Sequence, residues 1–148
     1  MKDTKRHYRI LVFDDHQEIL DLLKAVFDLR EYEVLTYLHP LDCPLFKHDS
    51  CLCPEGQTWA DIILTDINMP YMKGIDLLES QKAKGCSCRH QALMSGDFTW
   101  EDERKARELD LKLFKKPFAV EELFQWLDSI EPQINLHMRL TDHNCMHN

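Results

Sequence analysis

Aspartate, serine and lysine residues stand at the ends of four of the apolar runs in this chain. Asp14 and Asp15 end the first run, Asp66 ends a later one, and Ser95 and Lys116 end the last two. In an open parallel sheet, ligands bind beyond the carboxyl ends of the strands. If these runs are strands of one such sheet, three carboxylates, a hydroxyl and an ammonium group meet in a single crevice.

This set of groups favours a divalent cation and phosphoryl transfer. Crowded carboxylates repel one another unless a cation joins them, and an all-oxygen set of ligands suits Mg²⁺. Asp15 and Asp66 can each give one oxygen, and the backbone carbonyl of Asn68 can give a third. A carboxylate can act as the nucleophile and form an acyl phosphate. Lys116 and the metal then stabilise charge on the phosphoryl oxygens, and Ser95 offers a hydroxyl donor.

A simpler explanation exists for each position taken alone. An acid at a strand end is most often a turn residue or a helix cap. Ser95 alone is a loop hydroxyl, and Lys116 alone is a solvated charge. Because such residues stand at the ends of four of the five expected strands, we favour a shared site over four unrelated local roles.

The elements that must position these residues follow from hydrophobic periodicity. The expected strands span residues 8–13, 33–38, 60–65, 91–95 and 111–116, and the expected helices span about 19–30, 40–48, 74–84, 100–109 and 119–130. Strands that alternate with helices predict an α/β fold with a parallel sheet covered on both faces. In the strand order 2-1-3-4-5, the first and third strands are neighbours, which brings their acids together.

Length and charge limit the classes of protein that need to be considered. The chain has 148 residues and a formal net charge of −8, which predicts one domain and argues against a general nucleic-acid binder. No run approaches the ~18 apolar residues of a membrane span, and none near the N-terminus is long enough for a signal peptide. We therefore expect a cytoplasmic protein without a membrane segment, with a domain over residues 1–131 and a flexible tail over 132–148.

Four motifs resemble those of the receiver domain of two-component response regulators. They are Phe13-Asp-Asp-His16, Ile63-Leu-Thr-Asp-Ile-Asn-Met-Pro70 with Gly74, Leu93-Met-Ser-Gly96 and Lys115-Lys-Pro-Phe118. The resemblance covers a core of about residues 8–130, with a cysteine-containing insertion at about 49–59. It implies a flavodoxin-like, doubly wound sandwich, with a five-stranded parallel sheet in the order 2-1-3-4-5 and five helices.

The resemblance also implies a role for each residue of the crevice. Asp66 is the expected phosphoacceptor. Asp14 and Asp15 are the acidic pair, in which Asp15 ligates Mg²⁺ and Asp14 acts on the ion indirectly. Ser95 senses the phosphoryl group, and Lys116 pairs with it. The bond between Lys116 and the following proline is often cis in this family.

The implied function is that of a stand-alone phosphoacceptor in a phosphorelay. The domain takes a phosphoryl group from a sensor histidine kinase or a histidine phosphotransfer protein, and it then changes its binding to an unknown downstream protein. It catalyses only its own phosphorylation and dephosphorylation, and homodimerisation stays open. One alternative is an aspartyl-phosphate phosphohydrolase, although such enzymes usually carry Asp-x-Asp on the first strand. The other is a zinc-built interaction module with an inert acidic crevice.

Two further features concern switching and partner surfaces. Receivers usually carry Tyr or Phe three residues before the lysine, but this chain has Leu113 there, with Phe114 beside it. The usual aromatic switch is therefore in doubt. Partners of receivers commonly dock on the face that includes the fourth helix, which here carries Arg104, Lys105, Arg107 and Glu108. A solvated helix surface is an equal explanation for any one of these residues.

The cysteines form two closely spaced pairs. They are Cys51 with Cys53, and Cys86 with Cys88. Both pairs precede strands at the amino-terminal edge of the sheet, where four thiolates could hold Zn²⁺. Because the spacing differs from the common Cys-x₂-Cys arrangement, we favour free thiols over a zinc site.

Overall fold

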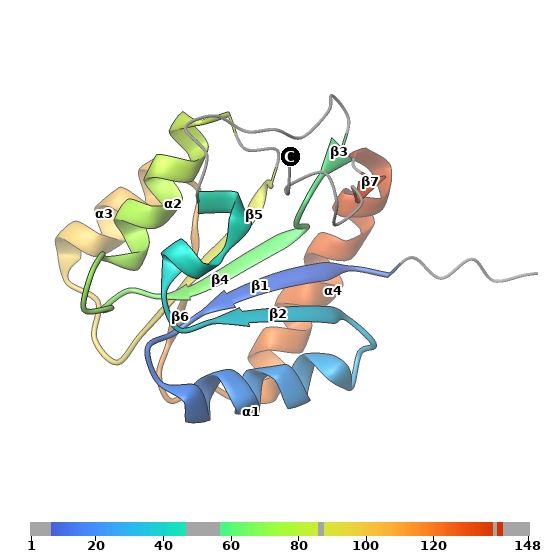
Figure 1. Cartoon of the computed structure of the whole chain (residues 1–148), viewed down its shortest axis with the longest axis horizontal. Helices are drawn as coiled ribbons and strands as arrows, with labels where there is room; N and C mark the ends of the chain where they lie inside the picture. The colour runs from blue at the N-terminus through green and yellow to red at the C-terminus, as the bar shows by residue number, and fades with distance from the viewer. Residues whose placement is uncertain (1–6, 47–56, 86–87, 138, 141–148) are drawn as a thin grey trace, which may run out of the picture.

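The computed structural model describes residues 7–46, 57–85, 88–137 and 139–140. Its central sheet has five parallel strands in the order β2-β1-β4-β5-β6 (Figure 1). The strands are β1 (Arg9–Phe13), β2 (Glu33–Tyr37), β4 (Ile62–Asp66), β5 (His90–Ser95) and β6 (Lys112–Lys115). The predicted fold class and strand order are confirmed, since these strands are the five expected ones in the order 2-1-3-4-5.

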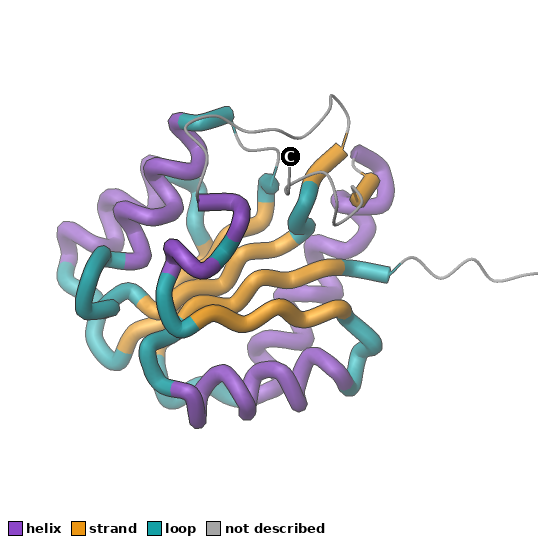
Figure 2. Tube along the Cα trace, in the orientation of Figure 1, coloured by secondary structure: helices purple, strands orange, loops and turns teal. Residues whose placement is uncertain are grey.

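Helices cover both faces of this sheet (Figures 1 and 2). The described part of the chain has four α-helices, namely α1 (Gln17–Asp28), α2 (Gly74–Ala83), α3 (Trp100–Glu108) and α4 (Val120–His137). Apolar residues of α1 and α4 pack on one face, and those of α2 pack on the other. The strands β1 and β4 are buried at every position, as expected for a parallel sheet between two helical layers.

The expected helix at residues 40–48 does not form in the described part of that range. Two single-turn 3₁₀ helices stand there instead, η1 (Pro40–Asp42) and η2 (Pro44–Phe46). The cause is the second proline. Pro44 has no N–H to donate within an α-helix, and it forces the preceding Cys43 into an extended conformation, with φ −91° and ψ 127°. The described residues therefore form four α-helices and two 3₁₀ turns rather than the five helices expected.

The last helix continues beyond its predicted end near residue 130. It runs to His137 and contains Pro132. Tertiary contacts hold the extra turn in place, because Ile134 is buried and the Tyr8 hydroxyl donates a 2.7 Å hydrogen bond to Asn135. Residues 132–137 thus belong to the helix and not to a tail.

Two short strands form a second, separate sheet that the sequence does not predict. They are β3 (Gln57–Thr58) and β7 (Arg139–Leu140), which pair in parallel. Two residues are too few for a recognisable period-two pattern. Residues 47–56, most of which belong to the predicted insertion at about 49–59, and residues 141–148 of the predicted tail lie outside the described part of the chain. Among the helices that the structure describes, none has the length and apolar character that crossing a membrane requires.

Candidate functional site

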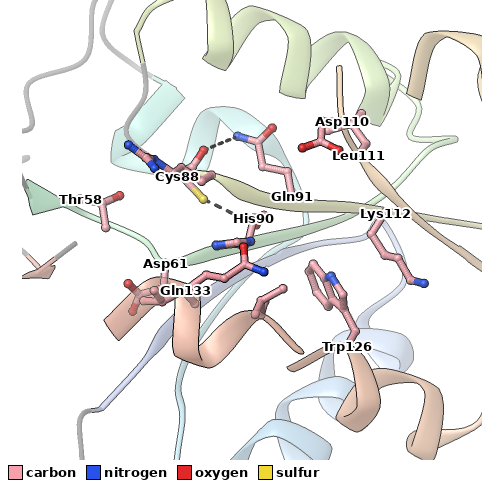
Figure 3. A pocket seen from close by; sticks show the side chains of 13 residues that line it. Thr58, Asp61, Cys88, His90, Gln91, Asp110, Leu111, Lys112, Trp126 and Gln133 are labelled. Atoms are coloured by element: carbon pink, nitrogen blue, oxygen red, sulfur yellow. Dashed lines mark hydrogen bonds between the residues drawn. The ribbon is translucent and has the colours of Figure 1, made fainter. Parts of the chain in front are cut away.

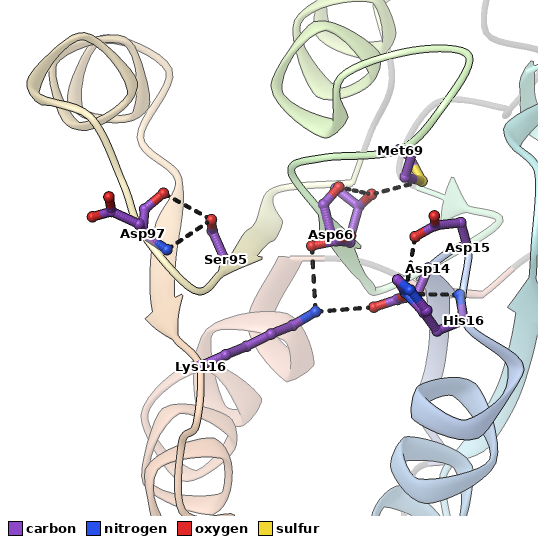
Figure 4. Close-up of polar contacts among 9 residues, drawn as sticks. Asp14, Asp15, His16, Asp66, Met69, Ser95, Asp97 and Lys116 are labelled. Carbon is purple, nitrogen blue, oxygen red and sulfur yellow. Dashed lines mark hydrogen bonds and ion pairs between the residues drawn. The ribbon is translucent and has the colours of Figure 1, made fainter.

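The carboxyl ends of β1, β4 and β6 meet around one lysine. Lys116 Nζ lies 3.2 Å from Asp14 Oδ2 and 3.3 Å from Asp66 Oδ1 (Figure 4). The lysine is 102 residues from one acid and 50 from the other along the chain, so only the sheet brings them together. The structure therefore brings these three residues together, as predicted from the sequence.

The two acids that contact Lys116 are removed from solvent. Asp14 is fully buried, and Asp66 is 6% exposed. Burial raises the pKa of Asp66, Lys116 opposes this rise, and the neighbouring charges of Asp14 and Asp15 add to it. Burial and the neighbouring carboxylates both disfavour the charged form of Asp66. The positive charge of Lys116 offsets this effect only in part.

Asp15 has an unsatisfied oxygen that fits a cation. Its Oδ1 atom is buried and accepts no hydrogen bond. His16 Nδ1 lies 3.1 Å from that oxygen, but off the direction that a hydrogen bond requires. Buried polar atoms without a partner are rare and call for an explanation, such as an ion or water. The oxygen-rich set of Asp14, Asp15 and Asp66 is of the kind that a hard divalent cation takes.

The loop after β4 places Asn68 next to Asp66. Ile67 N–H donates to the Met94 carbonyl at 2.9 Å, and Gly74 N–H donates to the Ile67 carbonyl at 2.9 Å. A Cβ at Gly74 would overlap the Asp66 carbonyl oxygen, so only glycine allows this close approach. The backbones of Asn68 and Lys73 also form an isolated antiparallel β-bridge across the loop. The loop backbone is thus fixed beside the acids.

Ser95 is in the predicted place, but its hydroxyl has local partners. It lies buried at the end of β5, where its Oγ donates to the Asp97 carbonyl at 2.9 Å and accepts from Asp97 N–H at 3.2 Å. Figure 4 shows the hydroxyl turned toward Asp97. The Ser95 carbonyl accepts a 2.7 Å hydrogen bond from Lys116 N–H, which joins the ends of β5 and β6.

Sequence reasoning missed two residues of this site. His16 Nδ1 lies 3.1 Å from oxygens of both Asp14 and Asp15, and Asp97 holds the Ser95 hydroxyl. The position of His16 directly after the acidic pair was the available signal. No pattern in the sequence indicates the turn made by Asp97.

Comparison with known proteins decides the family. The sequence model for the response regulator receiver domain matches residues 10–128. The chain belongs to this family. Two curated relatives are each 37% identical to this receiver: the nisin biosynthesis regulatory protein NisR of Lactococcus lactis over 73 residues, and the two-component response regulator ARR11 of Arabidopsis thaliana over 71. These stretches cover 47% and 48% of this receiver, but only 27% of NisR and 12% of ARR11.

Solved structures agree on the fold. The chemotaxis protein CheY4 of Vibrio cholerae superposes with a TM-score of 0.68 and 19% identity, over 84% of this receiver and 99% of that chain. A CheY-like receiver domain protein of Methanospirillum hungatei gives a TM-score of 0.69 and 21% identity, over 88% and 98% of the two chains.

Leu113 and Phe114 lie near the position where receivers usually carry an aromatic residue. Their side chains point to opposite faces of the sheet. Leu113 packs on the α2 face, while Phe114 is buried on the α1 and α4 face against Phe118 and Trp126. Side chains alternate across a strand, so Phe114 cannot take the place of an aromatic residue at Leu113.

The residues of α3 that were expected on a partner surface differ in the ion pairs that they form. Lys105 lies 3.3 Å from Asp76 and 3.2 Å from Glu79, both on α2. Arg104 pairs with Glu108 at 2.8 Å on the exposed side of α3. Arg107 is exposed. Lys105 therefore ties two helices of the receiver together.

The zinc hypothesis has no support. Cys51, Cys53 and Cys86 lie outside the described residues. Cys88 is buried, and its Sγ lies 3.7 Å from the His90 carbonyl oxygen, to which it donates. That contact is typical of a thiol that packs as a small apolar residue.

A cavity of about 680 Å³ opens at the edge of the sheet opposite to Asp66. Figure 3 shows the side chains that line it. Its wall includes His90 on β5, Asp61 before β4 and Trp126 on α4. Because His90 and Asp61 lie at the amino-terminal ends of their strands, the cavity is separate from the acidic crevice.

Proposed function

We propose that this receiver is a Mg²⁺-dependent phosphoacceptor and that Asp66 is the residue phosphorylated. The contact of Lys116 with both Asp14 and Asp66 carries the proposal. It places a positive charge where the oxygens of a phosphoryl group on Asp66 would lie. Such fixed charge is the main contribution that a protein makes to phosphoryl transfer.

Phosphorylation forms one bond and breaks one. Lys116 pairs with Oδ1 of Asp66, which leaves Oδ2 to attack the phosphorus. A bond between Oδ2 and phosphorus forms, the bond between phosphorus and the donor's imidazole nitrogen breaks, and the imidazole takes a proton from solvent. Water later hydrolyses the acyl phosphate and restores the carboxylate.

The chain's own oxygens can hold the metal. Asp15 and Asp66 would each give a carboxylate oxygen and Asn68 its backbone carbonyl, while Asp14 would act indirectly. The unsatisfied Oδ1 of Asp15 supports this assignment. Bound Mg²⁺ would supply positive charge that stabilises the moving phosphoryl oxygens.

Ser95 would be the residue that responds to phosphorylation. To reach a phosphoryl group on Asp66, its hydroxyl must leave both contacts with Asp97. The loop between β5 and α3 would then move with it. This local rearrangement does not require an aromatic residue at Leu113.

The partners follow from this chemistry. The donor would be a phosphohistidine on a sensor histidine kinase or a histidine phosphotransfer protein. The output would be a change in binding to a downstream protein, and the chain would catalyse only its own phosphorylation and dephosphorylation.

Intact mass spectrometry after incubation with acetyl phosphate and Mg²⁺ tests the proposal. The wild-type chain should gain one phosphoryl group, and this gain should disappear in Asp66→Asn and in the presence of a chelator. Asp76→Asn is a matched control, because Asp76 lies on α2 and pairs with Lys105 instead of Lys116. Equal labelling of Asp66→Asn would reject Asp66 as the acceptor.

A further inference from the structure

The cavity at the amino-terminal edge of the sheet has no role in the phosphoryl chemistry above. Its volume of about 680 Å³ lies in the range of small-molecule sites, roughly 300–1,000 Å³. Three parts of the fold form its wall, namely α4, the start of β5 and the turn that leads into β6 (Figure 3). Asp66 ends β4 at the opposite edge of the sheet, so a phosphoryl group on it does not reach this space.

One wall of the cavity is apolar. Trp126, Ile130 and Ile134 line it from α4, at the spacing of four residues that places side chains on one helix face. Trp126 is half-buried, and its ring meets Phe114 edge-to-face with 5.4 Å between the ring centroids. This contact holds the indole against β6, and the wall suits an apolar group of a ligand.

Three charged side chains line the same cavity. Arg89, Asp110 and Lys112 are exposed, and none of them forms an ion pair with a residue that the structure describes. The Lys112 ammonium group lies 5.5 Å from the centre of the Phe114 ring, which places it on the face of the sheet that α4 covers. Unpaired charges of both signs beside an apolar wall indicate a ligand that itself carries both signs.

His90 links two of these charges to the same place. Burial lowers the pKa of its half-buried imidazole, Arg89 lowers it further, and Asp110 opposes them, so both charges lie close to this ring. The neutral imidazole offers one donor and one acceptor. The remaining acid of the wall, Asp61, is buried and already accepts a 3.0 Å hydrogen bond from Arg9 N–H.

We propose that this cavity binds an α-amino acid with an aromatic or large aliphatic side chain. The side chain packs on Trp126, the carboxylate faces Arg89 and Lys112, and the ammonium group faces Asp110. A purely anionic ligand leaves Asp110 unpaired, and a purely cationic ligand leaves the two basic side chains unpaired. A zwitterion with an apolar side chain matches both the wall and the charges. This binding does not require phosphorylation of Asp66.

Isothermal titration calorimetry of the full chain with four small probes tests the proposal. L-Phenylalanine carries all three groups, 3-phenylpropanoate lacks the ammonium group, phenethylamine lacks the carboxylate, and glycine lacks the side chain. L-Phenylalanine should bind about ten times more tightly than each of the others, because each of them lacks one of the three contacts. No binding of L-phenylalanine, or a comparable affinity for any of the other probes, would overturn the proposal.

Lys112→Met tests where the carboxylate lies. The affinity for L-phenylalanine should fall by up to about fivefold, as expected for an exposed ion pair, while that for phenethylamine stays the same. Lys115→Met is the matched control, because Lys115 is also exposed but stands at the other end of β6 with its side chain on the opposite face. An unchanged affinity in Lys112→Met, or an equal loss in both variants, contradicts the assignment. Acetyl phosphate should label Lys112→Met as it labels the wild type, so the two proposals can fail separately.

Discussion

At the residue scale, the site holds more negative charge than it can neutralise without an ion. Asp14 and Asp66 share one ammonium group, and Asp15 adds a third carboxylate. Burial raises the pKa of Asp66, and the charges of Asp14 and Asp15 add to this rise against the opposing effect of Lys116. A proton on that carboxyl is therefore more favourable in the folded protein than in the unfolded chain.

Asp66→Asn should therefore stabilise the fold at neutral pH. A group whose pKa is higher in the folded protein than in the unfolded chain adds most to the free energy of unfolding below its pKa in the unfolded chain. That stabilisation is lost as the pH rises through its pKa in the folded protein. At pH 7 the Asp66 carboxylate is therefore destabilising, and a neutral isostere removes the penalty. Urea unfolding at pH 7 should show a higher midpoint for Asp66→Asn than for wild type, with a smaller difference near pH 4. An unchanged midpoint, or one lowered at pH 7, would contradict this account.

Gly74→Ala tests the close approach of the loop after β4 to Asp66. The new methyl group would overlap the Asp66 carbonyl oxygen, so the backbone must shift. Overpacking of this kind costs about 1–3 kcal/mol, and the shift should also slow labelling by acetyl phosphate. Gly96→Ala is the control, because a Cβ there has no neighbour within 4 Å. Similar unfolding free energies for the two variants would show that the loop is not constrained.

At the scale of elements, prolines and distant contacts decide where helices end. Pro44 prevents an α-helix after β2, because it cannot donate the required hydrogen bond and it extends Cys43. Pro132 has no such effect on α4. There, the burial of Ile134 and the hydrogen bond from Tyr8 to Asn135 outweigh the lost backbone hydrogen bond.

Ile134→Ala tests whether the last turn of α4 is part of the core. Removing a buried isoleucine side chain should lower the free energy of unfolding by about 2–5 kcal/mol. Gln133→Ala, one residue earlier and exposed, should change it by less than about 0.5 kcal/mol. Chemical denaturation measures both, and a negligible effect of Ile134→Ala would mean that α4 ends before this turn in solution.

At the scale of the whole molecule, the two edges of the sheet have different chemistry. The carboxyl edge holds the acids and Lys116, and the amino edge holds the cavity with His90. Burial lowers the pKa of His90, the nearby Arg89 lowers it further, and Asp110 partly opposes them. His90 is therefore neutral in the folded protein at a pH where it is already protonated in the unfolded chain.

This difference predicts a loss of stability in mild acid. Below the ordinary histidine pKa of 6.5, the unfolded state binds a proton that the folded state does not, so the free energy of unfolding falls as pH decreases. His90→Gln should weaken the pH dependence of the free energy of unfolding between pH 7 and pH 5. Thermal or urea unfolding across this range measures it, with His7→Gln as the exposed control. Parallel pH profiles for His90→Gln and wild type would contradict the assignment.

The sequence by itself determined the strands, their alternation with helices and the types of residue at their carboxyl ends. These features follow from local periodicity and from motifs that remain adjacent in the chain, such as Ile63–Pro70. Tertiary structure alone decided the contact of Lys116 with two acids, the length of α4, the turn that holds Ser95 and the placement of His16 over the acidic pair. Each of these depends on packing or on hydrogen-bond direction, and local pattern does not encode the positions of atoms that meet only after the sheet has formed.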